Sequence, residues 1–275
     1  MIPRILSAAA LAAALVWSVP GAAQDAPGPE GRFQKIENGA CEVWDAAPQP
    51  QQTVTWTGAC AGGRAEGTGV LTWTWPRTDG KANADRYEGA MRAGKLHGKG
   101  IYTFADGDRY EGDWKGGKRH GKGVGTWADG GRYEGDWKDG KAHGKGVRTW
   151  ANGDRYEGDY RNDKPHGRGI YTWASGNRYE GDYRNDKRHG RGILTFADGG
   201  RYEGDWKDGK AHGKGVRTWA SGGRYEGDYR NDKPHGRGTL RMASGEVYAG
   251  TWTNGCFHQG ERRARVGASA AECGF

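Results

Sequence analysis

The sequence predicts an all-β fold: an elongated, single-layer antiparallel sheet of stacked 23-residue β-hairpins with disulfide-stapled ends. Three observations predict it: a 23-residue period, alternation of aromatic and charged residues within each period, and cysteines placed near the two ends. A fixed period of about 20–50 residues indicates a repeat array. The period is carried by Tyr87, Tyr110, Tyr133, Tyr156, Tyr179, Tyr202, Tyr225 and Tyr248.

Residues 1–23 are predicted to be a secretory signal peptide. Arg4 gives a positively charged start, and residues 5–16 form an apolar run that is too short to span a bilayer. Small residues follow, so cleavage is expected before Gln24. The alternative is a membrane anchor that stays uncleaved. The first cysteine is Cys41, which argues against a lipid-modified N-terminus.

Residues 24–80 are predicted to form a linker and an N-terminal cap. Residues 24–30 are rich in proline and alanine, as is typical of a linker. The cap then holds a degenerate copy of the unit, in which Trp56 takes the tyrosine position and Glu66 replaces the histidine. Eight extra residues separate this copy from the next. Terminal repeats are expected to be atypical, because one side has no neighbour.

A regular unit, residues 132–151, reads R-Y-E-G-D-W-K-D-G-K-A-H-G-K-G-V-R-T-W-A. Its first seven residues alternate, so Tyr133 and Trp137 are predicted on one face of a strand and the charged residues on the other. A turn follows, with aspartate and glycine where positive φ is required. In the second strand Val147 and Trp150 are three residues apart, which predicts either a β-bulge or a strand with two apolar faces.

The recurring aromatic residues, histidines and glycines are predicted to be structural. A glycine between two aromatic residues leaves room for a neighbouring ring. The glycine after each histidine is expected to adopt backbone angles that are costly for other residues, or to meet a ring closely. In two adjacent units the predicted structural residues are Tyr110, Gly112, Trp114, His120, Gly121, Gly123, Tyr133, Gly135, Trp137, His143, Gly144 and Gly146.

The pattern Y-x-G-x-W/Y-x-x-G/D-x-x-H-G-x-G over residues 86–255 resembles the MORN (membrane occupation and recognition nexus) repeat. The resemblance implies stacked β-hairpins that form one long, twisted antiparallel sheet. It also implies a surface for binding or assembly, with partners that differ widely within the family. We therefore place the repeat array at residues 81–255 and a C-terminal cap at residues 256–275, with a helical turn at residues 268–273.

The cysteines are predicted to pair within each end, as Cys41–Cys60 and Cys256–Cys273. Eight units with two strands each would span roughly 75–80 Å at about 4.8 Å per strand. A disulfide needs Cα atoms within about 7 Å of each other, so pairing between the ends is excluded. Each bond is expected to contribute about 2–4 kcal/mol by restricting the unfolded chain. The cysteine spacing does not match that of a zinc site.

The composition excludes a thick globular core. The chain has 52 glycines among 275 residues, and its 13 tryptophans and 13 tyrosines supply most of the large apolar surface. The formal net charge of +8 comes from interleaved charges, with carboxylates interrupting each basic run. Nucleic acid is therefore not expected as a partner.

The eight histidines follow the same period, but equivalent positions in adjacent units should lie about 9.6 Å apart, too far to share a metal ion. They are expected to pack turns, with pH sensing as the alternative. The sequence contains neither a nucleophile–base–acid set nor a phosphate-binding loop. Recurring pairs such as Glu111 and Asp113 are interpreted as strand-face charges. We therefore predict that the protein is not an enzyme and needs no cofactor.

The predicted function is that of a non-catalytic exported scaffold, periplasmic or extracellular and soluble after signal cleavage. Its expected partner is another protein of the cell envelope or a second copy of the chain. One alternative is a module that binds anionic lipid at a membrane surface. The other is a glycan-binding protein that uses the ladder of aromatic rings as a stacking platform.

Overall fold

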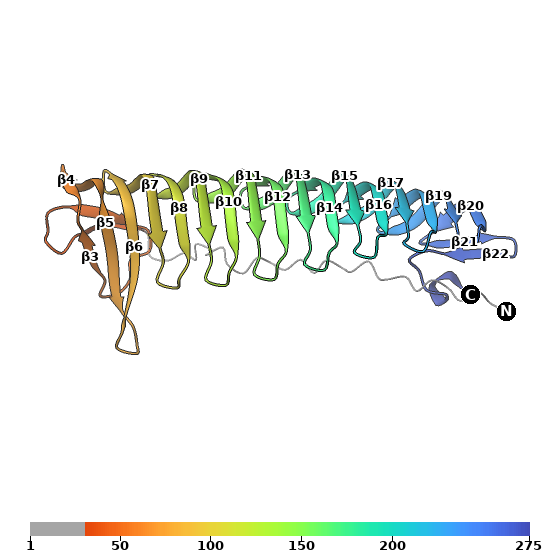
Figure 1. The fold of residues 1–275 in the computed structure, drawn as a ribbon, viewed down its shortest axis with the longest axis horizontal. Coiled ribbons are helices and arrows are strands. Elements are labelled where there is room, and N and C mark those ends of the chain that lie inside the picture. Colours follow the sequence, from red (N-terminus) through yellow and green to blue (C-terminus); the bar gives the residue numbers. More distant parts are fainter. Residues whose placement is uncertain (1–30) are drawn as a thin grey trace. The chain divides into compact units, whose positions relative to one another are not determined.

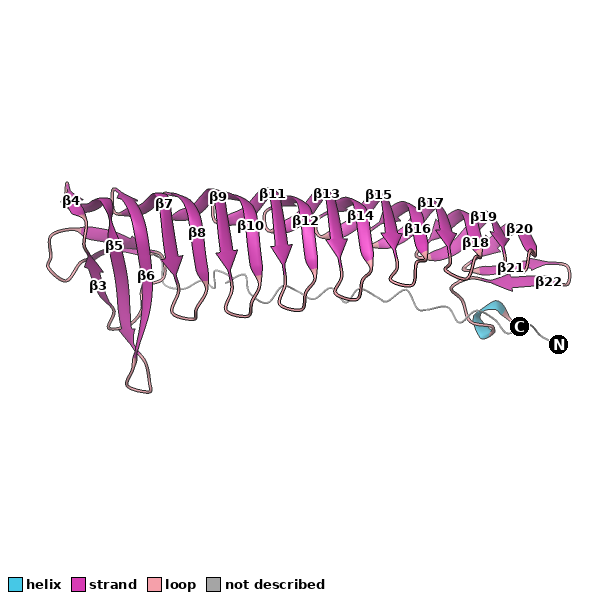
Figure 2. Ribbon diagram, viewed as in Figure 1, coloured by secondary structure: helices cyan, strands magenta, loops and turns pink. Residues whose placement is uncertain are grey.

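The computed structural model describes residues 31–275 of the chain (Figure 1). The predicted signal peptide, residues 1–23, and the predicted linker, residues 24–30, lie outside the described residues. The described chain divides into two compact units, residues 31–164 and residues 165–275, each built on antiparallel strands. Within residues 31–275 the helical part is one short 3-10 turn near the C-terminus (Figure 2). The predicted all-β fold of repeated hairpins is confirmed.

In the first unit, strands β5 to β12 pair in chain order, each antiparallel to the next. Strands β3 and β4 also pair with β5, and β1 pairs with β2. The strands are β1 (Arg32–Lys35), β2 (Glu42–Asp45), β3 (Thr53–Trp56), β4 (Ala59–Ala61), β5 (Arg64–Pro76), β6 (Ala82–Arg92), β7 (Lys95–Thr103), β8 (Arg109–Lys115), β9 (Lys118–Thr126), β10 (Arg132–Lys138), β11 (Lys141–Thr149) and β12 (Arg155–Arg161).

In the second unit the strands from β13 to β22 again pair in chain order and antiparallel. The unit starts at Pro165, the second residue of β13. Its elements are β13 (Lys164–Thr172), β14 (Arg178–Arg184), β15 (Lys187–Thr195), β16 (Arg201–Lys207), β17 (Lys210–Thr218), β18 (Arg224–Arg230), β19 (Lys233–Arg241), β20 (Val247–Thr253), β21 (Cys256–Gln259), β22 (Arg262–Arg265) and the 3-10 turn η1 (Ala271–Cys273).

The first strand of each hairpin bends at its glycine, which brings its two aromatic residues together. In a straight strand, residues four apart are separated by roughly 13 Å. The ring centroids of Tyr133 and Trp137 are instead 4.9 Å apart, with the rings nearly perpendicular. The Tyr133 hydroxyl donates a hydrogen bond to the carbonyl of Asp136, 2.9 Å away. The same ring contact recurs at 4.9–5.2 Å in other units, so the sheet folds over its own aromatic residues.

The second strand carries a bulge opposite this bend. β10 and β11 pair regularly as far as Gly135 with Gly146, and the register then shifts before Trp137 pairs with Ala142. The bulge holds the glycine that follows the histidine, Gly144 in this hairpin, which has a φ of +68°. The predicted unusual backbone of these glycines is confirmed, with φ between +58° and +94° at Gly98, Gly121, Gly144, Gly167, Gly190, Gly213 and Gly236.

Neither a bulge nor a two-faced strand lies between Val147 and Trp150, because β11 ends at Thr149. Trp150 belongs to the next turn. Its N–H donates to the carbonyl of Asp154, and its carbonyl accepts from the N–H of Gly153, both at 2.9 Å. The prediction of a bulge or a two-faced strand here is therefore wrong, because the strand ends before Trp150 and the two side chains do not belong to the same strand.

The N-terminal cap contains the degenerate hairpin that the sequence predicts. Trp56 of β3 pairs with Leu71 of β5, in the register that pairs Tyr133 with Arg148 in the regular unit. The eight extra residues lengthen the hairpin of β5 and β6, whose turn projects beyond those of the following hairpins (Figure 1).

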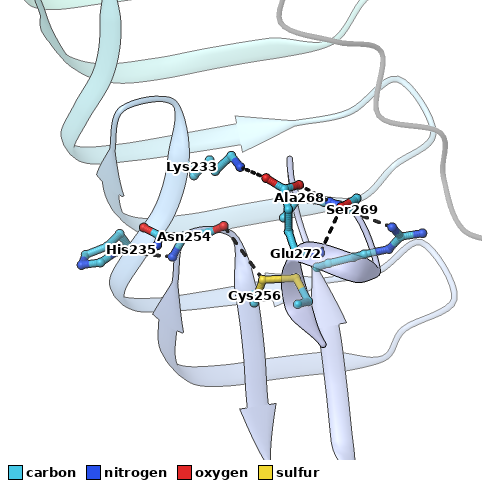
Figure 3. The surroundings of a disulfide bond; sticks show 9 residues. Lys233, His235, Asn254, Cys256, Ala268, Ser269 and Glu272 are labelled. Carbon is cyan, nitrogen blue, oxygen red and sulfur yellow. Dashed lines mark hydrogen bonds and ion pairs between the residues drawn. A yellow bond between two sulfur atoms is a disulfide. The ribbon is translucent and has the colours of Figure 1, made fainter. Parts of the chain in front are cut away.

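The disulfides form as predicted, with Cα separations of 5.7 Å for Cys41–Cys60 and 5.5 Å for Cys256–Cys273. At the C-terminus the second bond ties η1 to β21 (Figure 3). Glu272 of η1 accepts a hydrogen bond from the Lys233 ammonium, 2.7 Å away, so the cap also holds the first residue of β19. The helical turn is shorter than the predicted residues 268–273.

Candidate interaction surface

A row of alternating glutamate and aliphatic side chains crosses the strands on the face opposite the tyrosines. Glu134 of β10 pairs with Val124 of β9 on one side and with Val147 of β11 on the other. We call this the Glu/aliphatic row. In the first unit it consists of Glu88, Ile101, Glu111, Val124, Glu134, Val147 and Glu157. In the second unit it consists of Ile170, Glu180, Ile193, Glu203, Val216, Glu226, Thr239 and Ala249.

Ion pairs flank the row on both sides. Each glutamate is held by the arginine two residues before it, as in Arg132–Glu134 at 2.7 Å. On the other side, the Lys122 ammonium lies 2.6 Å from Asp136 on the next strand. Burial tends to raise the pKa of Asp136, but Lys122 and a hydrogen bond from the N–H of Lys145 outweigh it, so the pKa lies below its usual value. The predicted strand-face charges are thus mutually compensating pairs.

A shallow groove of about 810 Å³ follows the Glu/aliphatic row in the first unit. Row residues such as Ile101 and Val124 line it, together with Lys99, Lys122 and several of the repeat glycines. The second unit has a smaller hollow of about 340 Å³ beside Thr239, a member of the same row. The row therefore offers aliphatic side chains and backbone between two lines of charge.

The aromatic ladder lies inside the fold. Tyr110 and Tyr133 are 0% and 1% exposed, and Trp114 and Trp137 are 6% and 5% exposed. Burial raises the pKa of Tyr133 well above that of a free tyrosine. A sugar ring cannot reach these buried rings, whereas the aromatic residues that follow the second strands, such as Trp127 and Trp150, are half-exposed.

The predicted structural glycines lie directly against the tyrosine rings or the bulge. A Cβ atom on Gly112 would lie 2.6 Å from the Tyr110 hydroxyl, and one on Gly135 would lie 2.8 Å from the Tyr133 hydroxyl. The paired glycines of the second strands, Gly123 and Gly146, face the same rings. A Cβ on Gly121 or Gly144, in the bulges, would instead meet an aspartate carboxylate at 2.6 Å and 2.7 Å respectively.

The seven histidines from His97 to His235 are half-buried, whereas His258 is exposed, and several of the seven lie against the turn of the next hairpin. In the second unit, Nδ1 of His235 accepts a hydrogen bond from the N–H of Asn254, 3.3 Å away. In the cap, Glu66 occupies the histidine position and accepts the equivalent bond from the N–H of Ala93, 2.8 Å away. In hairpins whose turn carries an aspartate, Nδ1 of His120 lies 3.8 Å from the Asp139 carboxylate. This contact supports the predicted role in turn packing. His143 occupies the equivalent position, where its Nδ1, like that of His120, is buried without a hydrogen-bond partner among residues 31–275.

Two kinds of buried charge were missed by sequence reasoning. The Arg148 guanidinium lies 3.6 Å from the centroid of the Trp127 ring, and Arg119 lies 4.4 Å from that of Trp137. Burial lowers the pKa of Arg148. In the first unit, burial also raises the pKa of Asp85, which accepts hydrogen bonds from the Tyr102 hydroxyl and from a turn N–H. These contacts hold neighbouring hairpins together.

Basic residues at the hairpin turns were also missed, because charge was judged along the chain. The last paired residues of successive hairpins are both cations, which we call the basic tips. In the first unit these pairs are Arg92 with Lys95, Lys115 with Lys118, and Lys138 with Lys141. In the second unit they are Arg184 with Lys187, Lys207 with Lys210, and Arg230 with Lys233. The signal in the sequence is a cation at both ends of each four-residue turn.

Over residues 31–275, no group of three or more histidine, cysteine, aspartate or glutamate side chains is placed to bind a metal ion. The same residues contain no helix that is long and apolar enough to cross a membrane.

The sequence model of the MORN repeat matches seven consecutive segments, residues 87–109, 110–132, 133–155, 156–178, 179–201, 202–224 and 225–247. Together they cover more than half of the chain, which therefore belongs to the MORN repeat family. The degenerate first hairpin and the last one, from Tyr248, lie outside the matched segments.

No curated protein shows a significant sequence match. Among solved structures, the TCP domain of SAS-4 (dCPAP) of Drosophila melanogaster, in complex with a proline-rich motif of Ana2 (dSTIL), is 10% identical with a TM-score of 0.36, over 65% of this chain and 88% of that chain. A streptogramin B lyase is 14% identical with a TM-score of 0.17, over 82% of this chain and 78% of that chain. At such TM-scores neither likeness supports an argument about this protein.

Proposed function

We propose that this protein is a non-catalytic exported scaffold that binds another protein of the cell envelope, or a second copy of itself, along the Glu/aliphatic row. The observation that carries the proposal is the groove of about 810 Å³ on this row. The row repeats the same side chains at the same register in successive hairpins, and repeat arrays use such extended surfaces for binding.

Because the charges beside the groove are already paired, they favour a partner that binds through complementary shape and apolar contacts. Arg109 and Arg132 already neutralise Glu111 and Glu134, each at 2.7 Å, so a partner gains little from pairing with these exposed charges. The half-buried aliphatic residues between them are the groups that a partner can desolvate at the centre of an interface. We infer an elongated partner segment that lies across several strands.

Export is supported by the two disulfides, which include all four cysteines of the chain. Such bonds persist in oxidising compartments and are rare in the cytosol. Together with the predicted signal peptide, they favour a periplasmic or extracellular location. We further propose that the protein is not an enzyme, because its carboxylates recur as the same ion pairs in unit after unit.

Site-specific photo-crosslinking in intact cells tests the proposal. p-Benzoylphenylalanine is placed at Val124, in the groove, and in a matched variant at Ala128, an exposed turn residue on another part of the same unit. We expect Val124 to give one dominant crosslinked species, either with another envelope protein or with a second copy of the chain. Crosslinking that is equally strong from Ala128, or absent at both positions, would contradict the proposal.

A further inference from the structure

Like charges face each other at the closed end of successive hairpins. Lys138 is directly opposite Lys141 across the β10–β11 pair, and Lys115 is directly opposite Lys118 across β8–β9. Two like charges in directly opposed positions of an antiparallel pair destabilise it. A repeated cost of this kind indicates that the cations serve a contact outside the hairpin.

The tip cations of the first unit differ from the other lysines of the same strands. Lys122 and Lys145, near the middle of β9 and β11, each lie within 2.7 Å of an aspartate on the next strand. Lys118 and Lys141, at the start of those strands, are exposed and lie within salt-bridge distance of no carboxylate among residues 31–275. The fold therefore neutralises one set of lysines and leaves the other set available.

The aspartates within the turns do not neutralise the tips either. Asp163 points back to the preceding hairpin, where its carboxylate accepts the N–H of Ala142 at 2.7 Å. Asp139 lies 3.8 Å from Nδ1 of His120, also in the preceding hairpin. Within residues 31–275 neither carboxylate lies within salt-bridge distance of a lysine or arginine, so the lysines and arginine beside them stay open to an external anion.

Two of the basic tips of the first unit, at residues 115–118 and 138–141, are free, and we count with them the next turn, residues 161–164, which likewise has a cation at each end, Arg161 and Lys164. They hold six cations and two carboxylates, a net charge of +4. The preceding tip is partly covered, because the Lys95 ammonium lies 4.9 Å from the centroid of the Trp44 ring in the cap. Successive tips should lie about 9.6 Å apart, which is two strand spacings.

We propose that these three basic tips bind a linear polyanion, a chain of phosphate or acidic sugar groups that runs along the row of turns. A row of cations matches a linear chain of anions, which can contact each tip in succession and release its counterions. The tips consist of lysine, arginine, glycine, aspartate and asparagine. They contain no aromatic or aliphatic side chain to enter a membrane interface or to stack on nucleobases, so neither a bilayer nor single-stranded nucleic acid fits as well.

The test measures binding of fluorescein-labelled inorganic polyphosphate to the full-length protein by fluorescence anisotropy at two salt concentrations. With four net charges engaged, the logarithm of the affinity should fall with the logarithm of the salt concentration with a slope of about −3. Binding should then be roughly 50-fold weaker at 200 mM than at 50 mM NaCl by the same relation. The same measurement with labelled heparin tests whether a polymer of acidic sugars binds, and its affinity should depend on salt with a similar slope.

Two variants with the same change in net charge distinguish the contribution of the tip lysines to binding from the effect of the overall net charge. The tip variant carries K115Q, K118Q, K138Q and K141Q, and the control variant carries R32Q, K35Q and R77Q in the N-terminal cap and K81Q directly after it. Both variants should keep the far-UV circular dichroism of the wild type. The tip variant should bind polyphosphate at least tenfold more weakly at 50 mM NaCl, and the control variant within about twofold of the wild type.

An equal loss in the two variants would overturn the proposal, since binding would then reflect net charge alone. It would also be overturned if orthophosphate at the same phosphate concentration competed as well as the polymer. Tighter binding to phosphatidylglycerol vesicles would indicate a membrane surface instead, and tighter binding to single-stranded DNA would indicate base stacking. Because the groove of the Glu/aliphatic row is a separate surface, photo-crosslinking from Val124 should be unchanged in the tip variant.

Discussion

The glycine beneath each tyrosine ring should be among the least tolerant positions of the unit, and Gly146→Ala is the sharpest perturbation. A Cβ atom on Gly146 would lie 2.6 Å from Cε2 and Cζ of Tyr133, a separation that real Cβ atoms essentially never show. The ring cannot easily retreat, because Trp137 packs against it at 4.9 Å and its hydroxyl is bonded to Asp136. Overpacking of this kind costs about 1–3 kcal/mol, and we expect a loss of about 2 kcal/mol in the free energy of unfolding.

Gly125→Ala is the matched control in the same sheet. A Cβ on Gly125 would lie 3.3 Å from the Trp127 ring and 3.5 Å from the Trp137 ring, which small adjustments can accommodate. Equivalent positions in other hairpins hold Arg148 and Leu194. We expect Gly125→Ala to change the free energy of unfolding by less than about 0.5 kcal/mol.

Urea unfolding followed by circular dichroism gives both values, and hydrogen exchange shows whether the Gly146→Ala loss is confined to residues 133–149, as local opening of a repeat predicts. In a Tyr133→Leu background the Gly146→Ala cost should shrink, because the two positions are in contact. If Gly146→Ala and Gly125→Ala cost the same, the packing argument is refuted.

Three further predictions concern charge, the turns and the ends. The hydrogen bond and ion pair with Lys214, at 2.6 Å, lower the pKa of Asp228 in the folded protein. The stabilisation that this contact gives is therefore complete above the unfolded-state pKa of about 3.9, and it is lost as the pH falls through the lower pKa of the folded state. Asp228→Asn should therefore lower the urea midpoint at pH 7 more than at pH 2, and equal shifts would contradict this. His235→Ala should speed hydrogen exchange at Asn254, and His235→Gln should do so less if its side-chain oxygen replaces Nδ1 as the acceptor. Reduction of both disulfides should increase exchange at the two ends before the central hairpins, whereas uniform loss would exclude the stapling role.

The repeat, the strand faces and the disulfides were predictable because they depend on spacing alone. The 23-residue step gives the number of hairpins, and alternation places Tyr133 and Trp137 on one face. The positive φ of the glycine after each histidine also followed from sequence. The bend at Gly135 did not, since alternation describes a straight strand and gives no sign that residues four apart will touch.

The surface was harder to predict than the interior. Lys138 and Lys141 lie beside an aspartate in the chain, so charge counted along the sequence appears neutralised. In the fold that aspartate turns toward the preceding hairpin, and the lysines of successive turns come into a row. The role of the histidines could have been inferred from the cap, where Glu66 retains an acceptor at the histidine position.

Deletion of one complete unit tests the central claim most directly, namely that each 23-residue unit is a hairpin whose core is shared only with its neighbours. Removing residues 133–155 joins Arg132 to Tyr156 and preserves every strand pairing in kind. We expect circular dichroism per residue and cooperative unfolding as in the wild type. Removing residues 133–143 deletes one strand and its turn, so the next strand cannot pair antiparallel, and this variant should lose the fold. If the complete-unit deletion also unfolds, or the half-unit deletion folds equally well, the account is contradicted.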